Sequence, residues 1–307
     1  MASDWYLKTS SNWKLVNNAF VKVSGNWKEI QEGYIKVSGA WKQFYQAFVA
    51  TAFSTATANT TIVVPDGANA IHVQAAVGGG SGGVKGAEYD KAGGESAGAG
   101  GASGGFVSDQ VYSVTQGETL TLTVGAGGAA STGSSYNTTA GSGGNTVLSG
   151  STTGTIFTLT GGVGGSGTGG GVQGPLRSNN PSTAGTATVA ASVLTSGSFK
   201  ESDGSSASIP SATTLDNGPV GSYNSSGNGV AGTNPGNCGG DNCQITGGVG
   251  GASYNGNISG GAGGVASSSN GGNGSRGSGA GGGGAQGQTN GGDGGAGEIV
   301  YRFLRVQ

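Results

Sequence analysis

The stretch Ile71-His72-Val73-Gln74-Ala75-Ala76-Val77-Gly78-Gly79-Gly80-Ser81-Gly82-Gly83 joins two kinds of sequence without a break. Its first half, residues 71–77, is a short apolar run with β-branched residues and predicts a strand. Its second half, residues 78–83, has five glycines in six positions. Glycine weakens the interior of helices and strands alike. The junction therefore predicts a fold in which glycine tracts leave from the ends of strands.

The same junction recurs along the chain. Further strands are expected at residues 61–64, 106–114, 119–124, 145–148, 155–160 and 298–304. Glycine tracts accompany them at residues 93–105, 125–128, 161–171, 247–251, 260–264, 271–284 and 291–297. We therefore expect an antiparallel β region from which the tracts leave and to which they return.

Glycine dominates the composition. The chain has 71 glycines in 307 residues, where average usage would give roughly 21. Because each ordered glycine loses more conformational entropy than other residues, an ordered form needs a packing that only glycine permits. Collagen is excluded, since the glycine spacing is irregular and only six prolines occur. The remaining structure is a bundle of extended three-residue helices that pair their backbone groups with neighbours. We expect a mainly β fold with a polyglycine II bundle and essentially no α-helix.

The first 50 residues follow a different pattern, which we assign to a separate domain, residues 1–50, before a glycine-rich domain, residues 51–307. A tryptophan followed by lysine recurs every 14 residues, and another aromatic residue follows seven positions later. These residues are Trp13, Trp27 and Trp41, then Phe20, Tyr34 and Phe48. A partial earlier copy begins at Tyr6. Alternating apolar and polar residues around Gly-containing turns predict short β-hairpins. Their aromatic residues form either a small core or a docking surface for a three-chain partner.

Inserts between the glycine tracts carry most of the other residue types. We expect those at residues 84–92, 131–140 and within 172–290 to turn round far from the sheets, the largest being residues 175–228. Loops on a rigid scaffold are common binding sites, and tyrosine suits such contacts. The expected binding residues are Tyr89, Tyr136, Phe199, Tyr223 and Tyr254, the last of which lies on a later insert whose direction the sequence leaves open.

Charge and cysteine content narrow the function classes. Residues 1–48 hold six lysines and three acids, and the remainder holds seven basic and twelve acidic residues, so the net charges are +3 and −5. No basic cluster typical of nucleic-acid binding is present in the sequence. The first residues do not resemble a signal peptide, and no apolar run is long enough to span a membrane. We expect synthesis in a cytoplasm.

Support for catalysis or metal binding is weak. Cys238 and Cys243 either form a small disulfide or remain free thiols, and two cysteines with one histidine do not indicate a zinc site. The only histidine, His72, is expected to be solvated or structural. Glu201 and Asp203 form the closest carboxylate pair in the long insert, a spacing that is common by chance. We expect no enzyme activity and no cofactor or metal.

Hairpin repeats with Trp13-Lys14, Trp27-Lys28 and Trp41-Lys42, followed by glycine tracts and variable segments, resemble the distal-tip adhesins of T-even-type phage long tail fibres. The resemblance implies that the N-terminal segment caps the end of a trimeric tail fibre. The attachment residues would be Trp5, Trp13, Phe20, Trp27, Tyr34 and Trp41. It also implies a polyglycine II sandwich whose variable loops bind a bacterial surface receptor, commonly an outer-membrane protein. One copy would sit at each fibre tip of the virion, without inserting into a membrane.

Two alternatives belong to other classes. An ice-binding protein could also be built from polyglycine II helices, although a regular threonine array is not evident in the tracts and the N-terminal repeats would have no role. A surface-polysaccharide depolymerase would use a carboxylate pair.

Overall fold

A computed structural model of the chain describes residues 6–9, 12–15, 20–30, 32–46, 48–83, 100–132, 137–168, 182–210, 271, 273–274, 279–282 and 290–307. Side chains are described in all of these except residues 6–9, 12–15, 28–29, 43–46, 137–138 and 167–168. Within this part every regular element is a strand, and the strand pairs are antiparallel. The prediction of a mainly β chain is confirmed.

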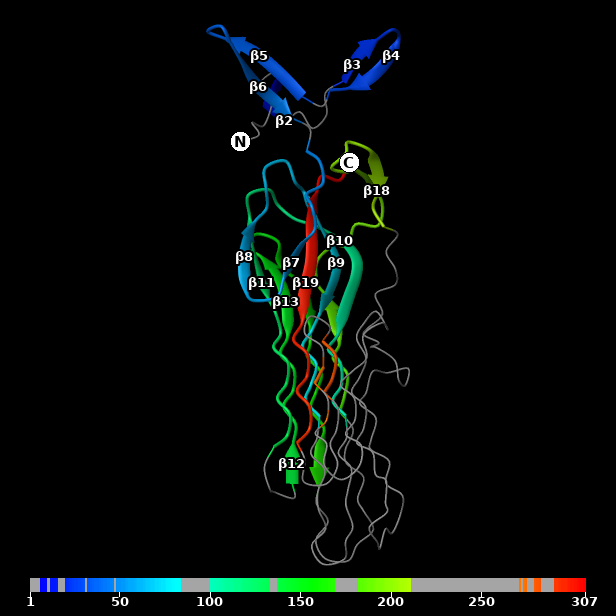
Figure 1. The fold of residues 1–307 in the computed structure, drawn as a ribbon. Helices are drawn as coiled ribbons and strands as arrows, with labels where there is room; N and C mark the ends of the chain where they lie inside the picture. The colour runs from blue at the N-terminus through cyan, green and yellow to red at the C-terminus, as the bar shows by residue number, and fades with distance from the viewer. Residues whose placement is uncertain are drawn as a thin grey trace, which may run out of the picture.

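Three separate hairpins occupy the N-terminal region (Figure 1). They are β1 (Tyr6–Thr9) with β2 (Asn12–Leu15), β3 (Phe20–Val23) with β4 (Asn26–Glu29), and β5 (Glu32–Val37) with β6 (Ala40–Gln46). Each strand is hydrogen-bonded only to its hairpin partner. The hairpins therefore do not merge into one sheet.

Two larger sheets follow. The four-stranded sheet has the order β10 (Phe106–Ser113), β9 (Ala70–Val77), β19 (Glu298–Leu304), β7 (Ser54–Ala56). The five-stranded sheet has the order β16 (Ala187–Val189), β14 (Gly154–Leu159), β13 (Thr146–Gly150), β11 (Thr119–Thr123), β8 (Thr60–Val63). Strands were expected at seven of these nine positions. The short β7 and β16 were not foreseen.

The two sheets share one hydrophobic core. Ile71 and Ile299 of the four-stranded sheet belong to the same buried cluster as Leu122, Leu148 and Phe157 of the five-stranded sheet. All five side chains have 0% exposure. Because side chains alternate along a strand, these residues define the inner faces of a β-sandwich.

The outer face of the four-stranded sheet is covered as well. Val111 and Leu304 belong to a second buried cluster with Phe199 and Ile209, which come from the long insert. The insert forms a small hairpin there, β17 (Ser198–Lys200) with β18 (Ser206–Ser208). Burial on both faces explains why β9 is apolar almost throughout, with only Gln74 exposed.

The glycine tracts extend from the sandwich in the direction away from the hairpins (Figure 1). Residues 78–83 lie at their centre, and consecutive N–H groups donate to three different neighbours in turn. Gly78, Gly79 and Gly80 donate to the carbonyl oxygens of Gly105, Gly144 and Gly295 at 2.8–3.0 Å. The next three residues donate to the same three segments, at Ala102, Gly141 and Gly292. The hydrogen bonds thus have the period of three that the expected helix requires.

The carbonyl groups of the central tract pair with three further segments. Gly79, Gly80 and Ser81 accept hydrogen bonds from the N–H groups of Gly162, Gly128 and Gly282. Residues 78–83 therefore contact six neighbouring segments through backbone bonds alone. We call the described glycine-rich segments around residues 78–83 the glycine bundle.

Close backbone contact explains the glycines of the bundle. A Cβ atom at Gly79 would overlap the carbonyl oxygen of Ala126, and one at Gly80 would overlap that of Ala280. The one central non-glycine residue is Ser81, which is fully buried and whose Oγ accepts a 2.7 Å bond from the N–H of Ala102. Its small side chain is accommodated there and its hydroxyl oxygen is satisfied by this bond.

The bundle separates the two ends of the molecule. The paired strands β12 (Asn137–Thr139) and β15 (Ser166–Thr168) lie at the end of the described bundle away from the hairpins (Figure 1). β12 directly follows Tyr136, which is itself outside the described residues. The expectation that the insert at residues 131–140 turns far from the sheets agrees with the position of β12.

One buried carboxylate ties two turns together near the hairpin end. Oε1 of Glu118 accepts bonds from the N–H of Thr115 and the hydroxyl of Thr153, both at 2.6 Å. Oε2 accepts bonds from the N–H groups of Thr152 and Thr153. Burial raises the pKa of Glu118, but these bonds lower it more, so the net pKa lies below its usual value.

Gly79→Ala should destabilise the glycine-rich domain by more than about 3 kcal/mol, because neither backbone can move aside in the packed bundle. Thermal unfolding followed by circular dichroism should show a lowered Tm. The matched control is Gly154→Ala, at the first residue of β14, which has open space around it and a φ of 78°. That variant should lose only about 1–2 kcal/mol, from backbone strain. Equal losses in both variants would contradict the close packing of the bundle.

Glu118→Gln should lower the free energy of unfolding at pH 7 by about 1–3 kcal/mol, because an amide cannot accept all four bonds. Since the folded pKa lies below the unfolded pKa, the carboxylate stabilises the fold fully above the unfolded pKa near 4.5. This contribution disappears as pH falls through the folded pKa. The difference between wild type and variant should therefore shrink from pH 7 towards pH 3 in denaturant titrations. A constant difference would refute the assignment.

Candidate functional site

The N-terminal hairpins are formed by local turn chemistry. Ser24 and Gly25 have φ of 50° and 85°, and Ser38 and Gly39 have φ of 51° and 86°. Two consecutive positive φ values are typical of the turn that matches the twist of a two-residue hairpin. The prediction of hairpins with Gly-containing turns is confirmed.

Equivalent residues occupy equivalent positions in all three hairpins. Lysine pairs with tryptophan across the strands, and an aromatic residue lies two positions before that lysine. The pairs are Lys8 with Trp13, Lys22 with Trp27 and Lys36 with Trp41, and the aromatic residues are Tyr6, Phe20 and Tyr34. The copy that begins at Tyr6 is therefore not partial, since it is the first strand of a complete hairpin.

The repeat unit thus begins at the aromatic residue and not at the tryptophan. Phe48, which continued the sequence repeat, does not form a fourth hairpin. It is partly buried against the core of the sandwich, next to Gly67, where an added Cβ atom would lie 3.2 Å from its ring. The 14-residue period of aromatic residues in the sequence therefore extends to Phe48, which lies outside the hairpins.

Exposed apolar side chains are concentrated on these hairpins. Eight of the eleven large hydrophobic side chains that are exposed in the described part of the chain lie here. They are Phe20, Val21, Val23, Trp27, Tyr34, Ile35, Val37 and Trp41. Trp27 is 69% exposed and Trp41 is 68% exposed. Such a concentration is typical of surfaces that contact another macromolecule, which makes the hairpins the candidate functional site.

Lysines accompany the tryptophans. Nζ of Lys22 lies 5.9 Å from the ring centroid of Trp27, and Nζ of Lys36 lies at the same distance from the ring of Trp41. A cation at this distance is weakly attracted to the ring face. Each exposed tryptophan therefore presents apolar area next to a positive charge.

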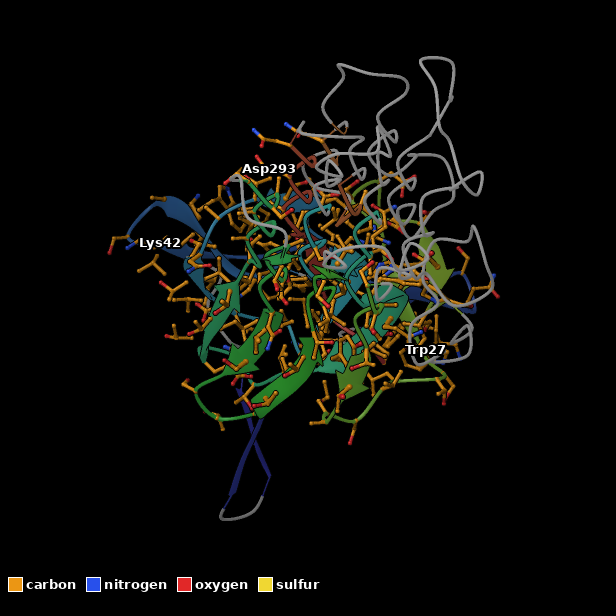
Figure 2. All side chains as sticks on the ribbon, turned by 90° about the horizontal axis from the view of Figure 1, so that it is seen from below. Trp27, Lys42 and Asp293 are labelled. Atoms are coloured by element: carbon orange, nitrogen blue, oxygen red, sulfur yellow. The ribbon has the colours of Figure 1, made fainter. Side chains whose placement is uncertain are left out.

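The three hairpins project in different directions around the long axis of the molecule. Figure 2 shows this from the opposite end, with one hairpin near Lys42, one near Trp27 and β1–β2 pointing a third way. Equivalent units in three directions suit a partner with three equivalent surfaces.

A short neck, residues 48–53, connects the hairpins to the sandwich. The N–H of Ala50 donates to the carbonyl oxygen of Lys200 at 2.7 Å. Thr51 pairs with Phe303 through both its N–H and its hydroxyl oxygen. The neck is thus bonded to β17 on one side and to β19 on the other.

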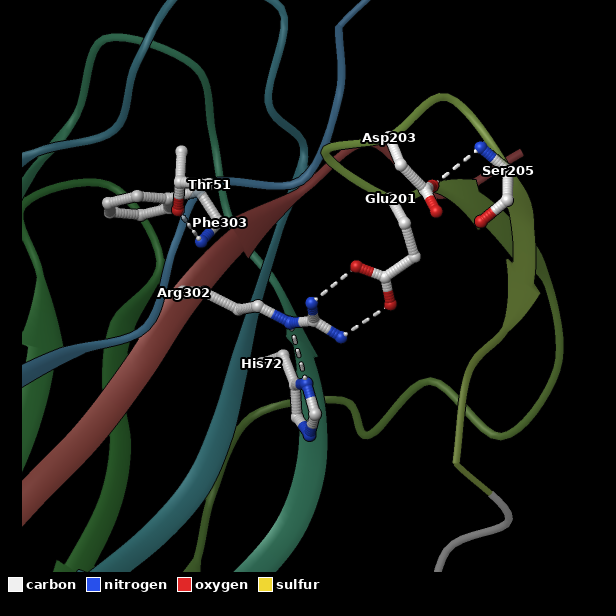
Figure 3. Close-up of polar contacts among 7 residues, drawn as sticks. All are labelled: Thr51, His72, Glu201, Asp203, Ser205, Arg302 and Phe303. Carbon is white, nitrogen blue, oxygen red and sulfur yellow. Dashed lines mark hydrogen bonds and ion pairs between the residues drawn. The ribbon is translucent and has the colours of Figure 1, made fainter.

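Arg302 of β19 holds the same region together (Figure 3). Its guanidinium group donates to both carboxylate oxygens of Glu201, at 2.7 and 3.0 Å. The guanidinium carbon also lies 4.5 Å from the ring centroid of Phe53 and 5.1 Å from that of Phe199. One cation therefore connects the neck, the β17–β18 hairpin and the central sheet.

His72 is the third polar member of this cluster. Its Nδ1 accepts a 3.3 Å bond from Nε of Arg302. Burial and the positive charge of Arg302 lower the pKa of His72, against the opposing effect of Asp109. The ring is therefore neutral at pH 7. The expected structural role fits this position, with 4% exposure.

Phe199 corrects one expectation. It was assigned to a distal receptor-binding loop, but it is 3% exposed and packs near the neck at the opposite end. The described part of the long insert, residues 182–210, also returns to the sandwich, where β16 pairs with β14. Burial of the apolar outer face of the four-stranded sheet explains why this segment returns.

The other assigned residues divide into three groups. Phe20, Trp27, Tyr34 and Trp41 are exposed on the hairpins, and the backbone of Trp13 takes the equivalent position. Outside the described residues lie Trp5, Tyr89, Tyr136, Tyr223, Tyr254, Cys238 and Cys243. The roles assigned to these residues stay predictions.

The carboxylate pair of the insert is engaged in structural bonds. Glu201 is paired with Arg302, and Asp203 accepts a 2.8 Å bond from the N–H of Ser205. Among the described residues, no group of three or more His, Cys, Asp or Glu side chains is placed to hold a metal ion. The same part of the chain has no helix of the length and apolarity needed to cross a membrane.

Comparison with known proteins gives one result for most of the chain. The family model described as a glycine-rich domain matches residues 54–304. This range comprises both sheets and the glycine bundle and excludes the three hairpins. No curated protein sequence matches the chain significantly.

Glu201→Gln should lower the free energy of unfolding by about 1–2 kcal/mol, between the values for exposed and buried ion pairs. Amide hydrogen exchange should rise at residues 198–208 and at Ala50, because the β17–β18 hairpin loses its bond to β19. Asp203→Asn is the matched control, since it changes a carboxylate of the same turn that does not contact Arg302. Unchanged exchange at Ala50 in the Glu201 variant would contradict the link between the pair and the neck.

Proposed function

The chain belongs to the glycine-rich domain family through residues 54–304, and we propose that it is a non-enzymatic adhesin at the tip of a T-even-type phage long tail fibre. In this proposal the three hairpins attach the chain to the end of a trimeric tail-fibre protein. Loops at the far end of the glycine bundle bind a receptor on the bacterial surface. The receptor class is an outer-membrane protein, and one copy occupies each fibre tip of the virion.

The observation that carries the proposal is the separation of the exposed hairpins from the far end of the described glycine bundle (Figure 1). Exposed Trp27 and Trp41 gather at one end, and the glycine bundle carries the chain away from them to β12 and β15 (Figure 1). A bundle held by backbone bonds along its length is suited to keep its ends apart. This arrangement supports attachment at one end and recognition at the other.

The chemistry of the hairpins supports a protein partner. Interface anchors are enriched in tryptophan, tyrosine and arginine, and such residues dominate binding energy when they are buried. The flanking lysines, such as Lys22 and Lys36, favour a partner surface that carries carboxylates. Residues 49–307 have a net charge of −5, so they do not favour a partner surface that carries carboxylates.

Trp27→Ala in the full chain should weaken binding to the long tail-fibre protein of its phage about 30-fold, the loss typical of one buried aromatic anchor. Surface plasmon resonance with the purified trimeric fibre protein would measure this loss. Adsorption of the free chain to bacterial cells should stay unchanged, because the proposal assigns receptor binding to loops at the other end.

Val63→Ala is the control, because Val63 is 61% exposed and belongs to strand β8 of the sandwich and not to a hairpin. It should leave both binding reactions unchanged. The proposal fails if Trp27→Ala abolishes cell adsorption while fibre binding stays normal. It also fails if the wild-type chain binds no bacterial strain of a Gram-negative panel in a way that a purified outer-membrane protein can compete.

A further inference from the structure

The two N-terminal hairpins whose side chains are described, β3–β4 and β5–β6, each have two apolar faces. In β3–β4, Phe20, Lys22 and Trp27 share one face, because side chains alternate along a strand and Lys22 lies opposite Trp27. Val21 and Val23 lie on the other face. They are 46% and 44% exposed, while Phe20 is 52% exposed. Neither face is covered by the described part of the chain.

The hairpin β5–β6 repeats this arrangement. Tyr34, Lys36 and Trp41 share one face, and Ile35 and Val37 lie on the other. Ile35 is 53% exposed, close to the 50% of its neighbour Tyr34 on the opposite face. The two-sided pattern is therefore a property of the repeat and not of one hairpin.

Two apolar faces are unusual for so small a unit. An antiparallel sheet at a surface normally buries one apolar face and exposes a polar one. An isolated two-stranded hairpin is marginally stable in water. A partner that covered only the aromatic face would leave Val21, Val23, Ile35 and Val37 in water. The apolar residues on both faces thus favour a partner that contacts each hairpin on both sides.

The charges on the hairpins indicate the chemistry of the partner surface that would contact them. Lys22 and Lys36 lie on the aromatic faces, while Lys42 pairs with Ile35 and so belongs to the opposite face. Residues 1–48 have a net charge of +3. A second copy of this chain would bring hairpins of the same charge, so it is a poor occupant. Partner surfaces that combine apolar side chains with carboxylates are complementary to both faces.

We propose that each hairpin inserts as a wedge between two adjacent chains of a three-chain partner, with one apolar face against each chain. This inference rests on the proposed attachment to a trimeric fibre. Three chains around an axis form three equivalent grooves, and each groove has walls from two chains. Three hairpins that point in three directions match this number (Figure 2). The wedge differs from docking on a flat surface, in which one face of each hairpin would stay free.

Neighbouring residues on opposite faces allow a direct test in the full chain. The photoreactive residue p-benzoylphenylalanine would replace Tyr34 in one variant, Ile35 in a second and both in a third. Each variant would be co-produced with the trimeric long tail-fibre protein, purified as a complex and irradiated. A probe that replaces Val63, on the sandwich, gives the control.

The wedge predicts that positions 34 and 35 both cross-link to the fibre protein and that position 63 does not. The doubly substituted variant should yield a product that contains two fibre chains, as measured by denaturing electrophoresis and mass spectrometry. Cross-linking from only one of the two positions would overturn the wedge but leave fibre attachment intact. A co-purified complex that cross-links from neither position would also overturn the wedge and leave fibre attachment intact. Failure of the wild-type chain to co-purify with the fibre protein would overturn the attachment itself.

Discussion

The glycine-rich part of this protein depends on the pairing of backbone groups between segments. An extended three-residue helix makes no hydrogen bonds within itself, and buried N–H and C=O groups need partners. Residues 78–83 satisfy this requirement by bonding to six neighbouring segments with a period of three. Such contacts leave no room for a Cβ atom, as at Gly79 and Gly80. In the described segments, the abundance of glycine is thus a consequence of backbone packing.

The sandwich organises the segments that the bundle pairs. Strand β9 leads directly into residues 78–83, and residues 290–297 lead directly into β19, which lies next to β9 in the sheet. Strand register therefore places segments far apart in the sequence next to each other before they enter the bundle. At the opposite end, Arg302 of the same strand β19 bonds Glu201 and stacks on Phe53 of the neck. A single strand thus connects the bundle with the base of the hairpins.

Much of this arrangement could be predicted because its signals are local. The apolar strands, the Ser-Gly turns at residues 24–25 and 38–39 and the tryptophan period are all visible within a few residues. The β17–β18 hairpin was missed, because a short polar segment carries no periodic signal. Its apolar partners, Val111 and Leu304, lie far away in the sequence. The Arg302–Glu201 pair, separated by 101 residues, was equally invisible, and Phe199 was therefore assigned to the wrong end.

The amino-acid sequence by itself determined where the longer strands of the two sheets form, which segments require glycine, and which residues repeat in the hairpins. These properties follow from side-chain alternation, turn conformation and the absence of a Cβ atom, all of which act over a few residues. Only the tertiary structure decided which glycine segments are neighbours, since glycines are identical and carry no side chain to distinguish one partner from another. It also decided that both faces of β3–β4 and β5–β6 remain exposed while Phe199 is buried, because burial depends on what the rest of the chain brings close.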